Sequence, residues 1–288
     1  MRIRHALGET TIPQPPKRIV ALGYTDQDFL YALGHAPVGV REWWGRQPFA
    51  TWPWAEDERR ALGAEPAVLR GPAIDVEWVL ALEPDLIVSA YGALDRPTYE
   101  KLSRIAPVIA APAGYPAWGA PWQARLRLLD QATSGGTAET DTIVRSIEAK
   151  FAEIRRRHPE FAGKSAAVAD LRSGQFTLWG SHTPAVRFLR ELGFRFPADL
   201  EARADAAGWI RLSLEQAPLL DVDMLLWPNG KRKEVEKMDL YRTLKVHLED
   251  RSVWIDDPAL SAAIWFQTPL SIEFVLEQLP GRMGEAVE

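Results

Sequence analysis

Short runs of branched apolar residues alternate with helical patterns along most of the chain. Residues 18–23 (RIVALG), 84–90 (PDLIVSA) and 106–111 (APVIAA) have the length and composition of buried strands. Residues 28–34 and 97–105, which lie between these runs, have the apolar spacing of helices. Strands that alternate with helices predict helical layers around a mainly parallel sheet, so we expect an α/β fold.

A second series of the same kind follows. Its predicted strands are residues 166–171, 175–180, 222–228 and 252–256, and its clearest helix is residues 185–193. Both series are long enough to bury a core of their own, since the chain has 288 residues and 47% of them are hydrophobic. We therefore predict two lobes.

A long amphipathic helix separates the two series. Its apolar stripe stops at Pro159 and consists of Ile143, Val144, Ile147, Phe151 and Ile154. A helix of some twenty residues spans about 30 Å, the width of a small domain. We expect it to bridge the two lobes.

The two halves also repeat one another. The segments DVEWVLALEPDLIV and SLEQAPLLDVDMLL each place a glutamate (Glu77, Glu215) eight residues before an aspartate (Asp85, Asp223) that opens an apolar strand. FLYALG and FLRELG share four residues at identical offsets and occur in the same order. We infer a duplicated α/β lobe.

The predicted organisation is thus two similar α/β lobes with mainly parallel sheets. The N-terminal lobe covers residues 1–135, the bridging helix lies in residues 136–162, and the C-terminal lobe covers residues 163–288. A ligand cleft is expected between the lobes, because large pockets lie preferentially at domain boundaries.

Composition and charge exclude several classes of function. The net charge is -5, and the only basic stretches are residues 155–158 and 231–233, so nucleic acid is not expected as a partner. No apolar run reaches 18 residues. The chain has no cysteine, which removes disulfides, thiolate metal sites and cysteine nucleophiles. Its first residues lack an apolar signal core, so the protein is either cytoplasmic or a mature form with its targeting segment removed.

The usual motifs of catalysis are absent. No phosphate-binding loop, dinucleotide fingerprint, nucleophile elbow or H-E-x-x-H motif occurs. Five scattered histidines without ligand spacing predict no protein-bound metal, and no cofactor is expected. His182, in the turn WGSHTP, is better explained by a helix-entry turn than by a ligand contact. No local spacing forces two carboxylates together, so acid–base catalysis is neither indicated nor excluded.

Tryptophan is the unusual feature of the chain, which contains twelve. Four of them (Trp43, Trp44, Trp52 and Trp54) lie in REWWGRQPFATWPW, where a glycine and two prolines preclude a helix and no period of two survives. The segment is predicted to be a loop whose rings either form core or line a ligand site.

Other aromatic residues follow predicted strands. Trp179, Trp227 and Tyr91 come at strand ends, where open α/β sheets bind ligands. Trp78 and Trp254 lie inside predicted elements and are expected in the core.

The order of these segments resembles the class III substrate-binding proteins of ABC importers for iron-siderophores and cobalamin. The likeness rests on GETTIPQPPKRIVALGYTDQDFLYALGHAPVGV, DVEWVLALEPDLIVSAYG and LSLEQAPLLDVDMLL, and it covers nearly the whole chain. It implies two lobes joined by a stiff helix, with the cargo held between them. It also implies an extracytoplasmic carrier and not an enzyme, monomeric and without a cofactor, that meets iron only within the bound ferric siderophore.

Within this superfamily the chain is most similar to ferric-hydroxamate binders. Arg70 stands where they have an arginine before the first-lobe glutamate, and Tyr91 matches their binding tyrosine. AIWFQTPLS nominates Trp265, although Gln267 replaces an aromatic residue two places later, and Trp209 matches a tryptophan with a spacing that differs by about two residues. Strand ends, loop and resemblance together give the candidate ligand contacts Trp43, Trp44, Arg46, Trp52, Arg70, Tyr91, Trp179, Trp209, Trp227 and Trp265.

The resemblance gives Glu77 and Glu215 a separate role. They are expected to be exposed, one on each lobe, and to pair with arginines on the two copies of the permease. The alternative is that each only stabilises a helix N-terminus. The family also carries an N-terminal signal, often with a lipid-modified cysteine, so the lack of cysteine suggests that the chain begins after such an anchor.

Other cargoes and another class of protein stay open. Ferric catecholates would require converging cations, for which the candidates are Arg46, Arg172, Arg187, Lys231 and Arg232. Haem would require an axial ligand such as Tyr24, Tyr91 or His182, and cobalamin is a further alternative. An α/β hydrolase with tryptophan platforms for a carbohydrate would require two carboxylates about 5 to 10 Å apart.

Overall fold

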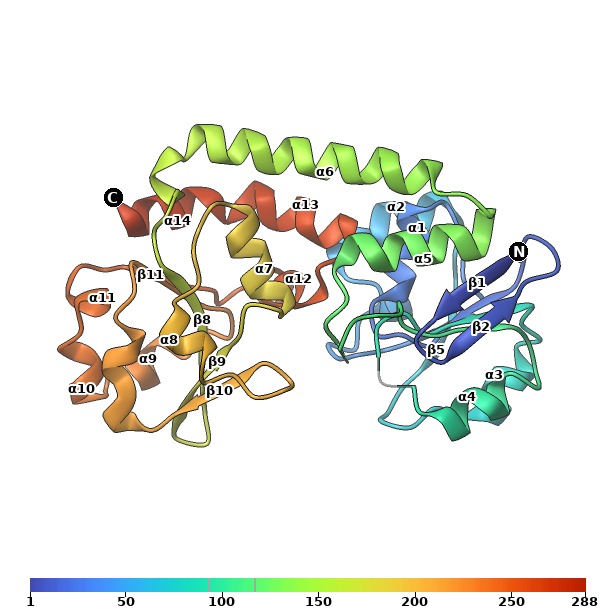
Figure 1. Cartoon of the computed structure of the whole chain (residues 1–288), viewed down its shortest axis with the longest axis horizontal. Coiled ribbons are helices and arrows are strands. Elements are labelled where there is room, and N and C mark those ends of the chain that lie inside the picture. The colour runs from blue at the N-terminus through green and yellow to red at the C-terminus, as the bar shows by residue number, and fades with distance from the viewer. Residues whose placement is uncertain (93, 117) are drawn as a thin grey trace. The chain divides into compact units, whose positions relative to one another are not determined.

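The computed structural model describes residues 1–92, 94–116 and 118–288, and the chain forms two compact units. The first unit is Met1–Ser146 with Thr268–Leu270, and the second is Ile147–Gln267 with Ser271–Glu288. Helix α6 (Ala138–Arg157) runs through the boundary as one continuous helix (Figure 1). The prediction of two α/β lobes with mainly parallel sheets is confirmed.

The first unit is built on a five-stranded sheet in the order β5-β4-β3-β6-β7, and every neighbouring pair in it is parallel. Its central strands, Ile19–Ala21 and Leu86–Val88, are fully buried, as expected for branched residues covered on both faces. The strands are β3 (Ile19–Ala21), β4 (Gly39–Arg41), β5 (Ala67–Leu69), β6 (Leu86–Val88) and β7 (Val108–Ile109).

Helices cover both faces of this sheet. In Figure 1, α1, α2 and α5 lie on one side of it and α3 and α4 on the other. Val79 and Leu102, from α3 and α4, join Val20 and Ile87 of the sheet in one core cluster. The helices are α1 (Asp26–Ala32), the 3-10 turns η1 (Pro48–Ala50) and η2 (Pro53–Ala55), α2 (Glu56–Ala61), α3 (Val76–Ala81), α4 (Arg96–Leu102) and α5 (Trp122–Ser134).

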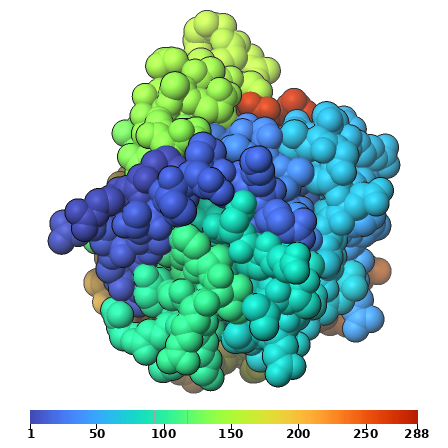
Figure 2. Space-filling model, turned by 90° about the vertical axis from the view of Figure 1, so that its right-hand side faces the viewer, coloured from blue at the N-terminus to red at the C-terminus, as the bar shows by residue number. Residues whose placement is uncertain are grey.

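An N-terminal hairpin, β1 (Arg2–His5) and β2 (Gly8–Thr11), packs on the same unit. The Thr10 hydroxyl donates to the carbonyl of Val108 at 2.7 Å, and the amide of Ala6 donates to the carbonyl of Ala111 at 2.8 Å. Figure 2, which faces the first unit, shows this dark-blue hairpin against green and teal segments. Its strands were not predicted from the sequence, because they alternate too briefly to give a pattern.

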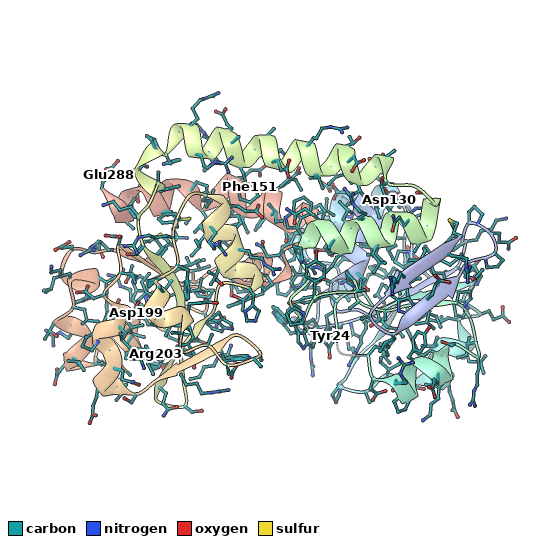
Figure 3. The ribbon with its side chains drawn as sticks, in the orientation of Figure 1. Tyr24, Asp130, Phe151, Asp199, Arg203 and Glu288 are labelled. Atoms are coloured by element: carbon teal, nitrogen blue, oxygen red, sulfur yellow. The ribbon has the colours of Figure 1, made fainter. Side chains whose placement is uncertain are left out.

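The start of α6 is fixed by a buried carboxylate of α5. Asp130, labelled in Figure 3, accepts hydrogen bonds from the backbone amide and the hydroxyl of Thr140, both at 2.9 Å. Because the first amides of a helix have no partner within the helix, such a carboxylate stabilises it. In the second unit, Phe151 of the same helix packs on Phe188 with a ring-centre distance of 5.6 Å.

The second unit has a five-stranded sheet in the order β10-β9-β8-β11-β12. Pairs β8–β11 and β11–β12 are parallel, whereas β9 runs antiparallel to both of its neighbours. The strands are β8 (Ala166–Arg172), β9 (Gln175–Trp179), β10 (Trp209–Leu212), β11 (Met224–Trp227) and β12 (Ser252–Trp254). The antiparallel strand follows from the short turn between β8 and β9, since a parallel pair requires a longer crossover.

Helices and 3-10 turns cover this second sheet as well. Leu220, Val235, Tyr241 and Val246 pack with Leu225 of the sheet in one core cluster. The elements are η3 (Pro159–Phe161), α7 (Pro184–Glu191), α8 (Ala198–Glu201), η4 (Leu214–Leu220), α9 (Arg232–Val235), α10 (Asp239–Arg242), α11 (Lys245–Leu248), α12 (Pro258–Phe266), α13 (Pro269–Gln278) and α14 (Pro280–Val287).

The duplication inferred from the sequence has a structural counterpart in strand register. Asp85 accepts the amide hydrogens of Lys17 and Arg18, both at 2.8 Å, and Asp223 accepts the amide hydrogen of Ser165 at 2.7 Å. In both units the aspartate precedes one central strand and binds the residue that precedes its parallel neighbour. The residue after each aspartate pairs with the first residue of that neighbour in both sheets. The two sheets therefore share one local plan.

Candidate ligand-binding site

The aromatic loop of residues 41–54 folds tightly on itself. Gly45 has a φ of 96°, and a Cβ atom there would lie 2.4 Å from the Trp52 ring, so only glycine fits. The segment contains the 3-10 turns η1 and η2 and no strand or longer helix after Arg41. The loop predicted from glycine and proline is thus what the structure contains.

The C-terminal half of this loop is packed. Trp52 and Trp54 are 4% and 8% exposed, and their rings stack with centres 5.3 Å apart. The indole Nε1 of Trp54 donates to Asp28 of α1 at 2.7 Å. These two rings position the loop and offer little surface to a ligand.

The N-terminal half of the loop joins a cluster of rings in which Tyr24, Trp43 and Trp44 are half-buried and Tyr91 is 5% exposed. Tyr24, labelled in Figure 3, stacks with Trp43 at 5.6 Å and with Trp118 at 5.9 Å. Tyr91 meets Trp43 and Trp118 edge-on at 5.6 Å and 5.1 Å. Trp44 packs on Trp43 at 4.1 Å. We call Tyr24, Trp43, Trp44, Tyr91 and Trp118 the first-unit aromatic cluster.

Trp118 is the most exposed ring of this cluster, at 38%. Its φ of 64° is a backbone conformation that non-glycine residues seldom adopt, and it costs about 1–3 kcal/mol. Trp118 was not predicted as a site residue, and Tyr24 was considered only as a haem ligand. The signal that could have found Tyr24 is its place directly after the glycine that ends the first predicted strand.

Two buried arginines pack against rings of this cluster. The guanidinium of Arg41 lies 4.3 Å from the centre of the Tyr24 ring, and that of Arg125 lies 4.4 Å from the centre of the Tyr91 ring. They are 7% and 1% exposed. Arg125 also donates to the Thr25 hydroxyl at 3.1 Å. Neither arginine was predicted, because neither lies in a motif.

Arg70, the predicted arginine, lies at the edge of the same sheet. Its side chain is 54% exposed, and its Nε lies 3.3 Å from a carboxylate oxygen of Glu42, whose side chain is 9% exposed. Within the described part of the chain, the other Glu42 oxygen and the Nε of Arg41 are buried without a hydrogen-bond partner. Arg46 is exposed, with a φ of 51°.

These side chains share one topological position. Arg70, Trp43, Tyr24 and Tyr91 follow β5, β4, β3 and β6, and Trp118 lies in the loop after β7. Because all five strands are parallel, the residues that follow them lie at the carboxyl edge of the sheet, where open α/β sheets bind ligands.

Buried Asp26 positions the tyrosine of this cluster. Its carboxylate accepts the amide hydrogens of Ala90 and Tyr91, at 2.6 Å and 3.1 Å. Burial raises the pKa of Asp26 from 3.8 to about 6, against the effect of these amides and of the Arg125 charge. A Cβ atom on Gly23 would lie 2.2 Å from this carboxylate, so the close approach requires glycine there.

The second unit has a tryptophan cluster of its own. Trp179 and Trp209 lie directly opposite one another on β9 and β10, with ring centres 5.6 Å apart, and Trp265 of α12 lies 4.5 Å from Trp179. The guanidinium of Arg172 lies 5.4 Å and 5.2 Å from the Trp179 and Trp209 rings, and Asp170 accepts a hydrogen bond from its Nε at 2.8 Å. Trp179 is 6% exposed, and the other two rings are half-buried.

Trp227 lies in a different environment. It is 1% exposed, stacks on Trp254 at 4.8 Å and belongs to the core of the second unit. A ring so enclosed has no face left for a ligand, because β11 is covered on both sides. Trp254 is buried as expected, and half-buried Trp78 packs over Gly39 of β4.

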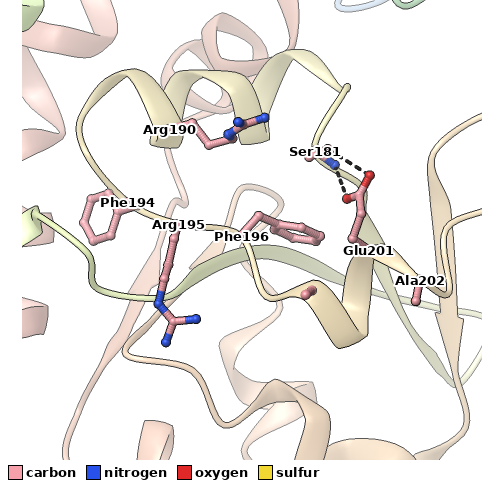
Figure 4. Close-up of a pocket in the computed structure, with 8 residues that line it drawn as sticks. Ser181, Arg190, Phe194, Arg195, Phe196, Glu201 and Ala202 are labelled. Atoms are coloured by element: carbon pink, nitrogen blue, oxygen red, sulfur yellow. Dashed lines mark hydrogen bonds between the residues drawn. The ribbon is translucent and has the colours of Figure 1, made fainter.

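An open hollow of about 730 Å³ also lies on the second unit (Figure 4). Phe194, Phe196, Arg190 and Arg195 line it, and the turn after Trp179 forms part of its rim. The amide and hydroxyl of Ser181 in this turn both donate to Glu201 at 2.8 Å. None of the tryptophans lines this hollow.

The two predicted docking glutamates occupy equivalent positions. Each is the second residue of a short helix, Glu77 in α3 and Glu215 in η4. Asp75 caps α3 by accepting the Glu77 amide hydrogen at 3.0 Å, and Ser213 caps η4. Both glutamates are exposed, and neither forms an ion pair with a described residue.

Two features are absent from the described residues. They contain no group of three or more histidine, cysteine, aspartate or glutamate side chains that could hold a metal ion. No helix among them is both long enough and apolar enough to cross a membrane.

The chain is similar to known solute-binding proteins. A periplasmic solute-binding protein of Mycobacterium smegmatis is 34% identical, with a TM-score of 0.86 over 100% of this chain and 98% of its own. The family described as periplasmic binding protein matches residues 19–244, most of the chain. The chain belongs to this family.

Two other similar proteins are described together with a siderophore. A probable siderophore-binding lipoprotein, YfiY, of Bacillus subtilis (strain 168) is 24% identical over 299 residues, which cover 95% of this chain and 87% of the relative. PiaA of Streptococcus pneumoniae, solved in complex with ferrichrome, is 24% identical with a TM-score of 0.85, and the match covers 99% of this chain and 98% of PiaA. The latter likeness establishes the fold, that of the class III periplasmic binding proteins.

Proposed function

We propose that this protein captures an iron(III)-siderophore of the hydroxamate or mixed hydroxamate type and delivers it to an ABC permease for iron uptake. Family membership supports the role of carrier. The siderophore in the name of the Bacillus relative and the ferrichrome bound to the pneumococcal neighbour support the class of cargo.

The observation that carries the proposal is the set of side chains after the five parallel strands of the first unit. Aromatic rings such as Trp43 and Trp118 suit the methylene chains of a siderophore. Arg70 and the phenols of Tyr24 and Tyr91 can donate to the oxygens around iron, since guanidinium and phenol groups both donate to oxygen acceptors. The siderophore itself ligates the iron, so the protein needs no metal ligand of its own.

The second tryptophan cluster is proposed as a further contact for the organic part of the cargo. Trp209 and Trp265 are half-buried, and Arg172 beside them adds a cation. Trp43, Trp44 and Arg70 complete the proposed set, with Arg46 at its edge, whereas buried Trp52 only positions the loop. Trp227 is left out because it is enclosed in the core.

In this proposal the protein is a carrier without a catalytic step. The acids nearest the first-unit aromatic cluster have structural partners, Glu42 with Arg70 and Asp26 with two backbone amides. The protein acts as a monomer outside the cytoplasm, either in the periplasm or anchored on the outer face of the cell membrane, and the lipoprotein name of the Bacillus relative supports the extracytoplasmic location.

Quenching of tryptophan fluorescence tests the cargo. Ferrichrome should quench saturably and the iron-free siderophore should not, because the proposed donors converge on oxygens that iron organises. Arg70→Ala should weaken binding about ten- to a hundredfold, the contribution of a hydrogen bond to a charged donor, and Tyr91→Phe about two- to tenfold.

The matched control is Arg60→Ala. Arg60 is likewise an exposed arginine paired with a glutamate, Glu56, but it lies on α2 away from the carboxyl edge of the sheet. Its removal should leave affinity unchanged. Tight binding of ferric catecholates or haem alone would refute the proposed cargo, and no response to any iron chelate would refute the carrier function.

We further propose that Glu77 and Glu215 dock the protein on the permease. Their support is the shared position in two equivalent helices and the lack of an ion-pair partner among the described residues. Two alike carboxylates in a duplicated chain suit a partner with twofold symmetry.

Replacing both glutamates with alanine should abolish uptake of radioactive ferrichrome iron in cells while the affinity of the purified protein for ferrichrome stays unchanged. Retained uptake would leave the glutamates with only their effect on the helix N-terminus, about 0.3–1 kcal/mol each. A loss of cargo affinity would also contradict the docking role.

A further inference from the structure

Each proposed docking glutamate lies beside exposed apolar side chains on the same helical turn. Leu80, three residues after Glu77, is 57% exposed, and Leu214, directly before Glu215, is 44% exposed. They are two of only a few large apolar side chains exposed to this degree in the described residues. Single exposed leucines are ordinary. Each of these two, however, lies on the same short helix as an exposed glutamate without an ion-pair partner among the described residues, whereas Glu249 beside exposed Leu248 pairs with Arg251 at 2.7 Å.

The two surfaces correspond position by position. In α3, Val76 and Leu80 stand before and three residues after Glu77; in η4, Leu214 and Pro218 stand before and three residues after Glu215. In α3, Val76 and Leu80 are four apart and share one side of the α-helix beside Glu77. Since η4 is a 3-10 helix, in which residues three apart align, Pro218 aligns with Glu215 and Leu214 lies on the neighbouring side. Val76 is half-buried, and Pro218 is exposed. The large exposed apolar residue therefore follows the glutamate in α3 (Leu80) and precedes it in η4 (Leu214).

The two helices are also held in equivalent ways within their units. Asp85 and Asp223 hold the strands that follow these two helices in the same register, and Asp75 and Ser213 cap the helices at the same position. Both helix starts are thus fixed at the same place relative to their sheets. Each fixed surface combines exposed apolar side chains with a carboxylate that has no ion-pair partner among the described residues, which is the composition of a recognition site with a charged and an apolar part.

We propose that Leu80 and Leu214 are apolar contacts to the permease, each packing against the subunit whose arginine pairs with the neighbouring glutamate. The inference rests on the proposed docking role of Glu77 and Glu215. The carboxylates give attraction and selectivity for a basic partner, and the leucines give contact area that salt does not screen. The partner is a permease dimer, because one chain offers two alike surfaces.

The test compares Leu80→Ser with Leu214→Ser, singly and together, in cells that lack the native copy. Each single change should lower ferrichrome-iron uptake about three- to tenfold at limiting amounts of the binding protein, and both together about ten- to a hundredfold. These values correspond to losing the burial of roughly half a leucine side chain at each site. The control is Leu248→Ser on α11, where the leucine is 68% exposed and the adjacent Glu249 is already paired with Arg251 at 2.7 Å.

Salt separates the two parts of the surface. Uptake by the leucine variants should fall at every ionic strength and keep the salt dependence of the native protein, whereas Glu77→Ala with Glu215→Ala should flatten that dependence. A photo-crosslinking residue in place of Leu80 or Leu214 should join the permease subunit, identified by mass spectrometry, and one in place of Leu248 should not.

The outcomes distinguish this inference from the proposed function. If the native protein fails to bind ferrichrome, the proposed function fails with it. If binding and uptake are native in both leucine variants, or if Leu248→Ser lowers uptake equally, only the leucine contact is refuted. A native dimer in sedimentation that dissociates in the leucine variants would show that a second copy of this chain covers these surfaces, and would overturn the proposal.

Discussion

Asp28 is a buried carboxylate that holds two segments of the first unit. One of its oxygens accepts hydrogen bonds from the indole of Trp54 at 2.7 Å and from the hydroxyl of Thr268 at 3.0 Å. Its other oxygen has no partner among the described residues. Burial raises the pKa of Asp28 from 3.8 to about 7; the two hydrogen bonds and Arg125 oppose this shift, and Glu58 adds to it. Asp28 therefore binds the aromatic loop, and its burial disfavours the ionised form of the carboxyl group.

The raised pKa makes stability depend on pH in a defined direction. Between about pH 4 and pH 7 the folded protein keeps the Asp28 proton and the unfolded chain has lost it, so the free energy of unfolding falls as pH rises through this window. Asp28→Asn removes this dependence, since its amide oxygen can keep both donors. The variant should gain up to about 4 kcal/mol relative to the native protein between pH 4 and pH 8.

Urea unfolding at a series of pH values measures this gain. Asp57→Asn makes the same chemical change at an exposed position of α2 and serves as the control. The slope, and not the absolute stability, is decisive, because the new amide nitrogen takes the place of the oxygen that has no partner among the described residues. Parallel pH profiles for the native protein and Asp28→Asn would contradict a pKa near 7.

The loop of residues 41–54 illustrates what sequence can and cannot predict about an element. Its glycine and prolines identify it as a loop, because they exclude both regular structures over the whole segment. Which of its rings are packed depends on contacts with distant residues, such as that of Trp54 with Asp28 and that of Trp52 with Gly45. Local pattern carries no information about such contacts, so the four tryptophans could not be divided into packed and half-buried pairs.

The supporting arginines were missed for the same physical reason. Arg41 and Arg125 approach the rings of Tyr24 and Tyr91 from other elements, and Arg125 is a polar residue within an otherwise ordinary helical pattern. By contrast, the place of Tyr91 at the end of a strand was predicted, since it follows an apolar strand pattern that can be read directly. The positions of candidate site residues were thus predictable where topology alone sets them, and not where packing does.

For the whole molecule, the two-lobed α/β fold was predictable because the same sequence pattern occurs in both halves of the chain. Both halves repeat the spacing from glutamate to aspartate, and both aspartates bind the residue before a neighbouring strand. The return of Thr268–Leu270 to the first unit was not predictable. These residues lie between α12 and the body of α13, and the hydroxyl of Thr268 donates to Asp28 of α1.

Binding of cargo should raise the thermal stability of the chain. Ferrichrome at a hundred times its Kd adds about 2.7 kcal/mol to the free energy of unfolding, and for 288 residues this corresponds to a rise in Tm of about 4–5 °C. If the two units unfold in separate transitions, the rise in Tm should be larger for the unit that includes the first-unit aromatic cluster, because the entropy of unfolding of one unit is smaller than that of the whole chain.

Trp118→Ala should reduce the rise in Tm by about 1–2 °C through lost ring stacking, whereas Tyr115→Ala, which removes another exposed ring from the same loop, should not. Scanning calorimetry with ferrichrome and with the iron-free siderophore measures these shifts. An equal rise with and without iron would place recognition on the organic chain alone, and an unchanged response of Trp118→Ala would remove Trp118 from the site.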